Sequence, residues 1–198
     1  MKKNTEKSTS KILVLDNYDS FTYNLVQMIE EIVDAKIDVF RNNEISLDDV
    51  EKYDKIILSP GPGIPKESGI LLDLIKTYAP KKSIFGVCLG LQAIGEAFGG
   101  NLINLSEIYH GVATEVQILN PKSKIFKNFP ETFEAGRYHS WALSPEDFPK
   151  ELEITAIDKD KMIMALQHKI YDVQAVQFHP ESILTPKGKE ILENFLKN

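Results

Sequence analysis

The chain has 198 residues, of which 42% are hydrophobic and 26% charged, and its net charge is −6. These values are typical of a single globular domain with a sizeable core. The negative charge argues against a nucleic-acid partner, because phosphate contacts need a surplus of Lys and Arg on one face. A single cysteine excludes an internal disulfide and favours a reducing compartment, the cytoplasm.

The N-terminal segment Met1–Ser10 is polar and Lys-rich and has no apolar run behind it. It predicts a short disordered tail and not a signal peptide. No apolar run in the sequence approaches the roughly 20 residues of a membrane span, so no membrane association is expected. Residues 11–198 are predicted to form one domain, because no linker or repeat divides them.

The first half of the sequence alternates strand and helix patterns. Lys11–Asp16 is a continuous apolar run, typical of a strand buried on both faces, and Asp19 or Ser20 can cap the helix that follows. Ser46 with Asp49, and Ser68, are candidate caps of two later helices. Further strands are expected at 35–40, 55–59 and 83–87, and a helix at 89–98 that Gly99-Gly100 ends. The alternation predicts a parallel sheet with helices on both faces.

The second half reads mainly as strands, with little helix before the C-terminus. Lys159-Asp160 is a candidate hairpin turn, and Lys187–Leu196 a closing helix. The expected strands are 101–105, 112–119, 132–136, 152–158, 162–168 and 173–178. The whole is therefore predicted to be an α/β domain with a mixed, largely parallel central sheet.

The only cysteine lies in Gly86-Val87-Cys88-Leu89-Gly90, between a strand and a helix. The pattern Gly-x-nucleophile-x-Gly is that of a nucleophile elbow, a tight turn that presents the middle residue at the sheet edge. The helix N-terminus favours a thiolate, and the N–H of Leu89 is left free to bind an oxyanion. The alternative is a buried structural cysteine, which is common for free Cys. The elbow pattern favours the catalytic interpretation.

A second candidate segment, Gln177-Phe178-His179-Pro180-Glu181, follows the last expected strand. A thiol needs a base, and the base needs a group that orients it. His179 and Glu181 are two residues apart, so in an extended chain both project the same way. We therefore predict a Cys88, His179, Glu181 triad, the alternative being a surface turn without a role.

The other three histidines are weaker candidates for the base. His110 and His139 have no carboxylate two residues away, and His168 is expected to be solvent-exposed beside Lys169. No Cys/His spacing indicates a metal site.

The loop Ser59–Gly63 contains two glycines and two prolines and lacks the Gly-Lys-Ser/Thr of a phosphate-binding loop. We expect it to supply the second oxyanion donor, from the N–H of Gly61 or a neighbour. A plain Pro-Gly turn is the alternative.

Four motifs together resemble the class I, or triad, glutamine amidotransferases: LSPGPG (58–63), GVCLGLQ (86–92), RYHSW (137–141) and QFHPES (177–182). With DNYDSFTYNL (16–25) and His110-Gly111, the chain is similar to the glutaminase subunits of anthranilate synthase and aminodeoxychorismate synthase. The resemblance covers almost everything from Lys11 onward and implies a flavodoxin-like fold.

The resemblance also implies site residues and a partner. Cys88 would be the nucleophile, His179 the base, Glu181 the orienting acid, and Gly61 and Leu89 the oxyanion donors. The glutamine-binding residues would be Gly61, Pro62, Gly63, Gln92, Ser140 and Trp141, the last two largely through backbone atoms. Ammonia would pass to a larger chorismate-binding subunit that faces Asp16–Phe21 and His110-Gly111. No cofactor is implied in this chain, Mg²⁺ being expected only on the partner.

Three positions depart from the family pattern: Leu91, Trp141 and Val112. The first two adjoin the glutamine pocket, and the third affects only details of the partner contact. Anthranilate synthase is preferred; the glutaminase subunit of aminodeoxychorismate synthase and a stand-alone cysteine hydrolase are the alternatives. A receiver domain would need an acceptor aspartate where Ser59 stands, and a flavin-binding module is disfavoured by the predicted site.

Overall fold

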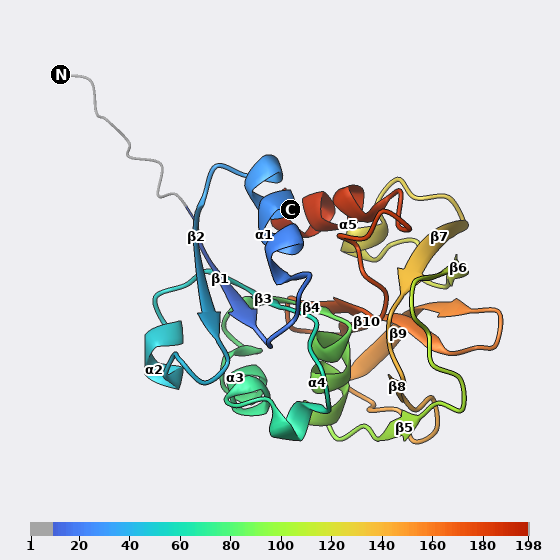
Figure 1. Cartoon of the computed structure of the whole chain (residues 1–198), viewed down its shortest axis with the longest axis horizontal. Coiled ribbons are helices and arrows are strands. Elements are labelled where there is room, and N and C mark those ends of the chain that lie inside the picture. The colour runs from blue at the N-terminus through green and yellow to red at the C-terminus, as the bar shows by residue number, and fades with distance from the viewer. Residues whose placement is uncertain (1–9, 198) are drawn as a thin grey trace.

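In the computed structural model the described residues are 10–197, and their central feature is a nine-stranded sheet (Figure 1). The expected tail at Met1–Ser10 lies, apart from Ser10, outside the described residues. The strand order is β2-β1-β3-β4-β11-β10-β9-β6-β7. The strands are β1 (Lys11–Asp16), β2 (Lys36–Arg41), β3 (Lys55–Leu58), β4 (Ser83–Val87), β6 (Val112–Ile118), β7 (Thr132–Arg137), β9 (Leu152–Asp158), β10 (Ile163–His168) and β11 (Val173–Val176).

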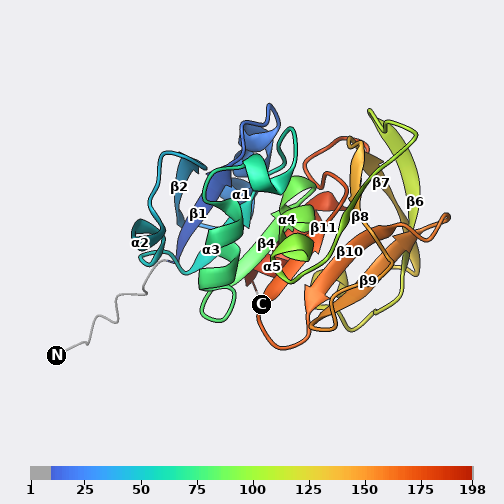
Figure 2. The same ribbon diagram turned by 90° about the horizontal axis from the view of Figure 1, so that it is seen from below.

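The sheet changes character at β11. The strands β2, β1, β3 and β4 pair in parallel, as the alternating sequence pattern predicts, and β11 from the second half joins them in parallel beside β4. The five strands have the order of a flavodoxin-like sheet. From β11 onward, through β10, β9, β6 and β7, every pair is antiparallel. Figure 2 shows this antiparallel part at the end of the molecule opposite β2. The predicted mixed α/β fold is confirmed.

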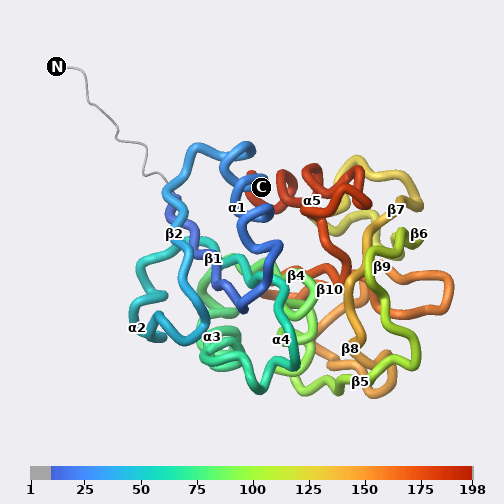
Figure 3. Tube along the Cα trace, in the orientation of Figure 1, coloured from blue at the N-terminus to red at the C-terminus, as the bar shows by residue number. Residues whose placement is uncertain are grey.

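Helices cover both faces of the parallel part. The helix α1 (Thr22–Ile32) packs beside α5 (Gly188–Lys197) on one face, so the first and the last helix of the described chain lie side by side (Figures 1 and 3). The short α2 (Leu47–Val50), α3 (Leu71–Tyr78) and α4 (Leu89–Ala97) cover the other face. Alternate residues of β1 enter the two cores: Ile12 and Val14 face α1 and α5, whereas Leu13 and Leu15 face α3 and α4.

The predicted N-terminal caps of α1 and α3 are wrong. Phe21 and not Asp19 or Ser20 precedes α1, and the Asp19 side chain instead accepts a hydrogen bond from the Phe21 N–H. Ser68 lies ahead of α3 and donates to the Ile64 carbonyl. Both residues serve local turns, which compete with capping for the same short polar side chains. The cap at Ser46 is confirmed, since its hydroxyl accepts from the Asp49 N–H at 3.2 Å.

A small two-stranded sheet lies beside the main one. It pairs β5 (Leu102–Asn104) with β8 (Trp141–Leu143), a strand that the sequence pattern does not predict. Three residues are too few to show an alternating pattern. The strand matters because it fixes the backbone next to Ser140, at the candidate site.

Candidate active site

Cys88 occupies the junction between β4 and α4, and its backbone has the strained geometry of an elbow. Its φ is 53° and its ψ −101°, values that a residue with a side chain rarely adopts. A Cβ on Gly86 would lie 2.6 Å from the Gly90 carbonyl carbon, and one on Gly90 would lie 2.8 Å from the Leu58 carbonyl oxygen. The two glycines therefore permit the turn that the sequence predicted.

His179 and Glu181 are in direct contact. Nδ1 of His179 lies 2.6 Å from Oε1 of Glu181, and both side chains are buried. The contact forms across a turn and not along an extended chain, because the Ser182 N–H donates to the His179 carbonyl at 3.2 Å. The backbone of His179 is held by Gly136 of β7, which accepts its N–H, and by the Thr185 hydroxyl, which donates to its carbonyl.

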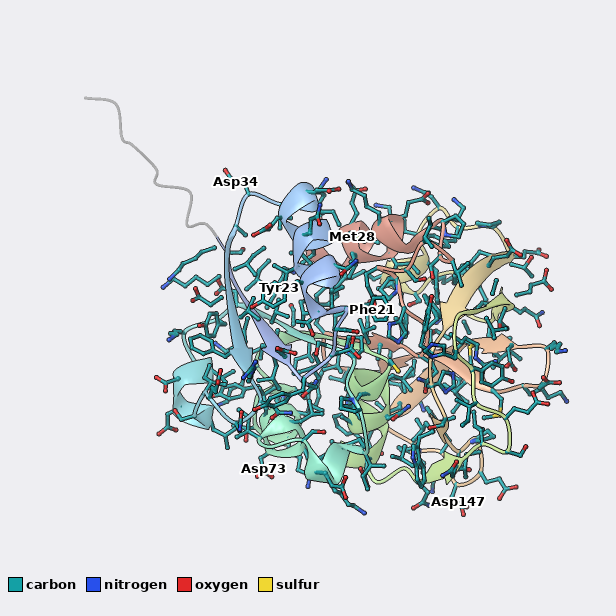
Figure 4. All side chains as sticks on the ribbon, in the orientation of Figure 1. Phe21, Tyr23, Met28, Asp34, Asp73 and Asp147 are labelled. Atoms are coloured by element: carbon teal, nitrogen blue, oxygen red, sulfur yellow. The ribbon has the colours of Figure 1, made fainter. Side chains whose placement is uncertain are left out.

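The other ring nitrogen of His179, Nε2, has no hydrogen-bond partner among the described residues. Burial lowers the pKa of His179, but the neighbouring Cys88 and Glu181 raise it further, to about 10. The rings of Phe21 and Tyr138 flank the imidazole, with centroids 5.8 and 4.9 Å away. Figure 4 labels Phe21 where the chain enters α1. An imidazole of this kind, oriented by a carboxylate and next to a thiol, is the arrangement that nucleophilic catalysis by cysteine requires.

The loop Ser59–Gly63 is anchored on Asn17, which sequence reasoning did not single out. The Asn17 N–H donates to the Ser59 hydroxyl at 2.8 Å, and its side-chain amide donates to the Ser59 carbonyl at 2.9 Å. A Cβ on Gly61 would meet Asn17 at 2.6 Å and Leu89 at 2.7 Å, so only glycine fits there. Leu89 is the first residue of α4, and its N–H has no acceptor within the helix. Gly61 and Leu89, the two residues expected to donate to the oxyanion, are therefore neighbours in space.

A cleft of about 240 Å³ opens next to Cys88. It brings together all the residues expected to bind glutamine, although they come from three segments that are far apart in the sequence. Its lining residues are Gly61, Pro62, Gly63, Cys88, Gln92, Ile108, Tyr109, His110, Tyr138, His139, Ser140 and Trp141. The structure therefore brings the predicted glutamine-binding residues and Cys88 together in one cleft, whereas Leu89, His179 and Glu181 are not among its lining residues.

Gln92 is tied into a hydrogen-bonded chain that leads to Cys88. Its side-chain nitrogen donates to the Trp141 carbonyl at 2.8 Å and to Oε1 of Gln177 at 3.3 Å. The buried Gln177 amide in turn lies 3.5 Å from the Cys88 Sγ. Gln177 belongs to the QFHPES motif, but its type gave no signal of a contact with the thiol.

The remaining histidines differ from one another. His110 is exposed at the cleft rim, and His139 is buried with both ring nitrogens engaged. Burial, and then the charge of Arg137, lower the pKa of His139 to about 4, so that it is neutral at physiological pH. The expectation that His168 is exposed is wrong. It is buried, stacks on Tyr171, and accepts hydrogen bonds from two backbone N–H groups.

Among residues 10–197 there is no group of three or more His, Cys, Asp or Glu side chains placed to hold a metal ion. Within the same range no helix has the length and apolar character needed to cross a bilayer.

The fold and the site together define a class of α/β enzymes that use a cysteine on an elbow after a parallel strand. Residues 13–198 match the family model for class I glutamine amidotransferases, and the chain belongs to that family. It is 47% identical, over 98% of its length and 68% of the relative, to anthranilate synthase beta subunit 1, chloroplastic, from Oryza sativa subsp. japonica.

Two further comparisons extend this finding. The chain is 43% identical to aminodeoxychorismate/anthranilate synthase component 2 of Bacillus subtilis, covering 94% of this chain and 95% of the relative. A solved structure from Thermoplasma acidophilum, described as that of a putative GMP synthase subunit, superposes with a TM-score of 0.85 at 24% identity. That match covers 96% of this chain and 93% of the other, and it shows the shared fold.

Proposed function

We propose that this chain is the glutamine-hydrolysing subunit of anthranilate synthase and supplies ammonia to a chorismate-binding subunit. The observation that carries the proposal is the 47% identity, over 98% of the chain, to an anthranilate synthase beta subunit. The site supports it, because the residues expected to bind glutamine line the same cleft as Cys88. No cofactor is assigned to this chain.

In the proposed reaction the Cys88 thiolate attacks the carboxamide carbon of glutamine. The N–H groups of Leu89 and Gly61 stabilise the tetrahedral oxyanion, each such donor being worth about 3 kcal/mol. His179, oriented by Glu181, transfers a proton to the nitrogen, and the C–N bond breaks to release ammonia. Water deprotonated by His179 then attacks the glutamyl thioester, giving glutamate and the free thiol.

The α-amino and α-carboxylate groups of glutamine are assigned to Gln92, Ser140 and Trp141. These residues line the same cleft as Cys88 and the loop Gly61 to Gly63. The assignment uses Trp141 mainly through its backbone, so its unusual side chain is tolerated.

The partner protein is proposed to cover the mouth of the cleft. Tyr18 is 48% exposed and Ile108 75% exposed, on or beside the two segments that the resemblance assigns to the partner. A docked partner that covered these side chains would remove their apolar surface from water, which favours association. Phe21, in the first of these segments, also touches His179, so docking and catalysis meet at one loop.

The test is co-purification with the chorismate-binding subunit, followed by identification of the product made from glutamine and chorismate. Anthranilate is expected. Aminodeoxychorismate would support the second candidate, which the Bacillus relative's name favours because it joins both activities. Strong glutamine hydrolysis by the chain alone, without binding to the synthase subunit, would contradict both.

A further inference from the structure

A buried ion pair lies behind the wall of the cleft. Nη1 of Arg137 donates to Oδ2 of Asp158 at 2.6 Å, and the two side chains are each 1% exposed. The other oxygen of Asp158 accepts the backbone N–H groups of Asp160 and Met162. The aspartate is therefore fixed by the hairpin between β9 and β10, and it fixes the guanidinium in turn.

Arg137 determines the tautomer of His139. Its Nε lies 3.0 Å from Nε2 of His139, and because a guanidinium nitrogen can only donate, Nε2 must be the acceptor. The ring proton is then on Nδ1, which donates to the Trp141 carbonyl at 2.8 Å. The Tyr109 ring stacks on the His139 imidazole, with 5.4 Å between ring centroids, and its centroid lies 3.6 Å from Cζ of Arg137. One aromatic ring therefore supports both groups.

The Trp141 carbonyl is the point at which this network reaches the cleft. It accepts from His139 on one side and from the Gln92 amide, at 2.8 Å, on the other. A carbonyl oxygen has two lone pairs, so both are used. The preceding carbonyl, of Ser140, accepts the Leu105 N–H at 2.8 Å. The backbone of Ser140–Trp141 is thereby held from both directions.

We propose that His139 is a positioning residue that sets the affinity for glutamine, by holding the Ser140–Trp141 backbone in the geometry that binds the α-amino and α-carboxylate groups. The inference rests on the proposed function, which assigns those groups to this backbone. His139 does not act as an acid or base, because neither of its ring nitrogens is free to reach the substrate. Its removal is therefore expected to raise KM for glutamine and to spare the reactivity of the thiol.

Because the chain has one cysteine, an effect on glutamine affinity can be separated from an effect on the reactivity of the thiol. Iodoacetamide alkylates the Cys88 thiolate but lacks α-amino and α-carboxylate groups, so it reports on the elbow alone. Glutamine in excess protects the thiol to the extent that it binds. The experiment measures the alkylation rate of the full-length chain, assembled with its synthase partner, against glutamine concentration. Mass spectrometry of the Cys88 peptide gives the rate.

Two substitutions at His139 test the role. His139→Phe keeps the ring and its stacking on Tyr109 but removes both nitrogens. It is expected to raise the half-protecting glutamine concentration about tenfold, the effect of one lost buried hydrogen bond. His139→Asn keeps a donor near the position of Nδ1 and is expected to recover part of the affinity. If His139→Phe does not fold, His139→Leu against His139→Asn gives the same comparison.

The matched control is His168→Phe, the same substitution at a buried histidine outside the cleft. It is expected to lower the thermal midpoint without changing protection by glutamine. Equal half-protecting concentrations for wild type and His139→Phe would overturn the inference alone. An equal loss in His168→Phe would also overturn it, because the effect would then be general destabilisation. A wild type that glutamine does not protect would overturn the proposed function itself.

Discussion

Nδ1 of His179 lies 2.6 Å from Oε1 of Glu181, across a turn that the Ser182 N–H closes. A carboxylate can only accept, so the ring proton of the neutral imidazole is on Nδ1 and Nε2 is left to take a proton. The backbone bonds to Gly136 and Thr185 hold the turn against β7. Glu181 therefore selects the tautomer of the base as well as its orientation.

Replacing Glu181 by Gln should keep the fold and weaken turnover. The glutamine amide can present a donor to Nδ1, which favours the wrong tautomer, and a loss of roughly 10²-fold or more in kcat is expected. Steady-state kinetics with glutamine, beside a thermal melt, measures the effect. Turnover equal to wild type would remove Glu181 from the proposed triad.

Replacing Cys88 by Ala should abolish the use of glutamine by the complex and leave its ammonia-dependent synthesis intact. The substitution removes the nucleophile, whereas free ammonia bypasses this subunit. Product formation is followed with glutamine and then with an ammonium salt. A variant complex that works normally on glutamine would show that Cys88 is not the nucleophile.

The fold was largely predictable because the strand signals are strong. Four apolar runs separated by helical periodicity define four of the five parallel strands, and the antiparallel strands follow turn residues such as Lys159-Asp160. Helix starts were less predictable, since Asp19 and Ser68 hydrogen-bond within local turns. The strand Trp141–Leu143 was missed because it is too short to carry a period.

The candidate site was predictable where function constrains residue type and spacing, as in the elbow around Cys88. It was not predictable where a residue acts through a contact distant in sequence. Asn17 meets Ser59 across 42 positions, and Arg137 meets Asp158 across 21. An Asn or an Arg in these segments has no signal of its own, because its partner depends on which strands are neighbours in the sheet.

The charge state of His179 should depend on Cys88. Burial lowers the pKa of His179, but Cys88 and then Glu181 raise it to about 10. Cys88→Ala removes one of these contributions, so the pKa should fall. NMR titration of the His179 ring protons in wild type and in Cys88→Ala measures it. The raised pKa of His179 contributes stability that is fully present below pH about 6.5 and is lost as pH rises through about 10. This alkaline loss of stability should therefore be smaller in Cys88→Ala. An unchanged His179 titration would contradict the contact.

His139 should destabilise the protein in acid, whereas the contribution of His179 is lost in alkali. Its pKa is lowered from 6.5 to about 4, chiefly by burial and then by Arg137. The folded state binds this proton more weakly than the unfolded state, so stability is present above pH 6.5 and is lost as pH falls through about 4. Urea unfolding at several pH values should show a smaller acid loss in His139→Phe, by up to about 3 kcal/mol. Identical pH dependence in the two proteins would show that His139 is not the titrating group.

Asn17 should affect kcat more strongly than glutamine affinity, which distinguishes it from His139. Asn17→Asp replaces the donor facing the Ser59 carbonyl by an acceptor, so the loop that carries Gly61 should lose its anchor. Misplacing one oxyanion donor costs about 10²-fold in kcat. Asn43→Asp is the matched control: it makes the same change of charge nearby, at an exposed residue whose side-chain oxygen already acts as the acceptor for the Tyr18 hydroxyl. Stopped-assay kinetics on the assembled complex gives both parameters. A rise in KM with kcat preserved in Asn17→Asp would mean that the loop binds glutamine and does not stabilise the oxyanion.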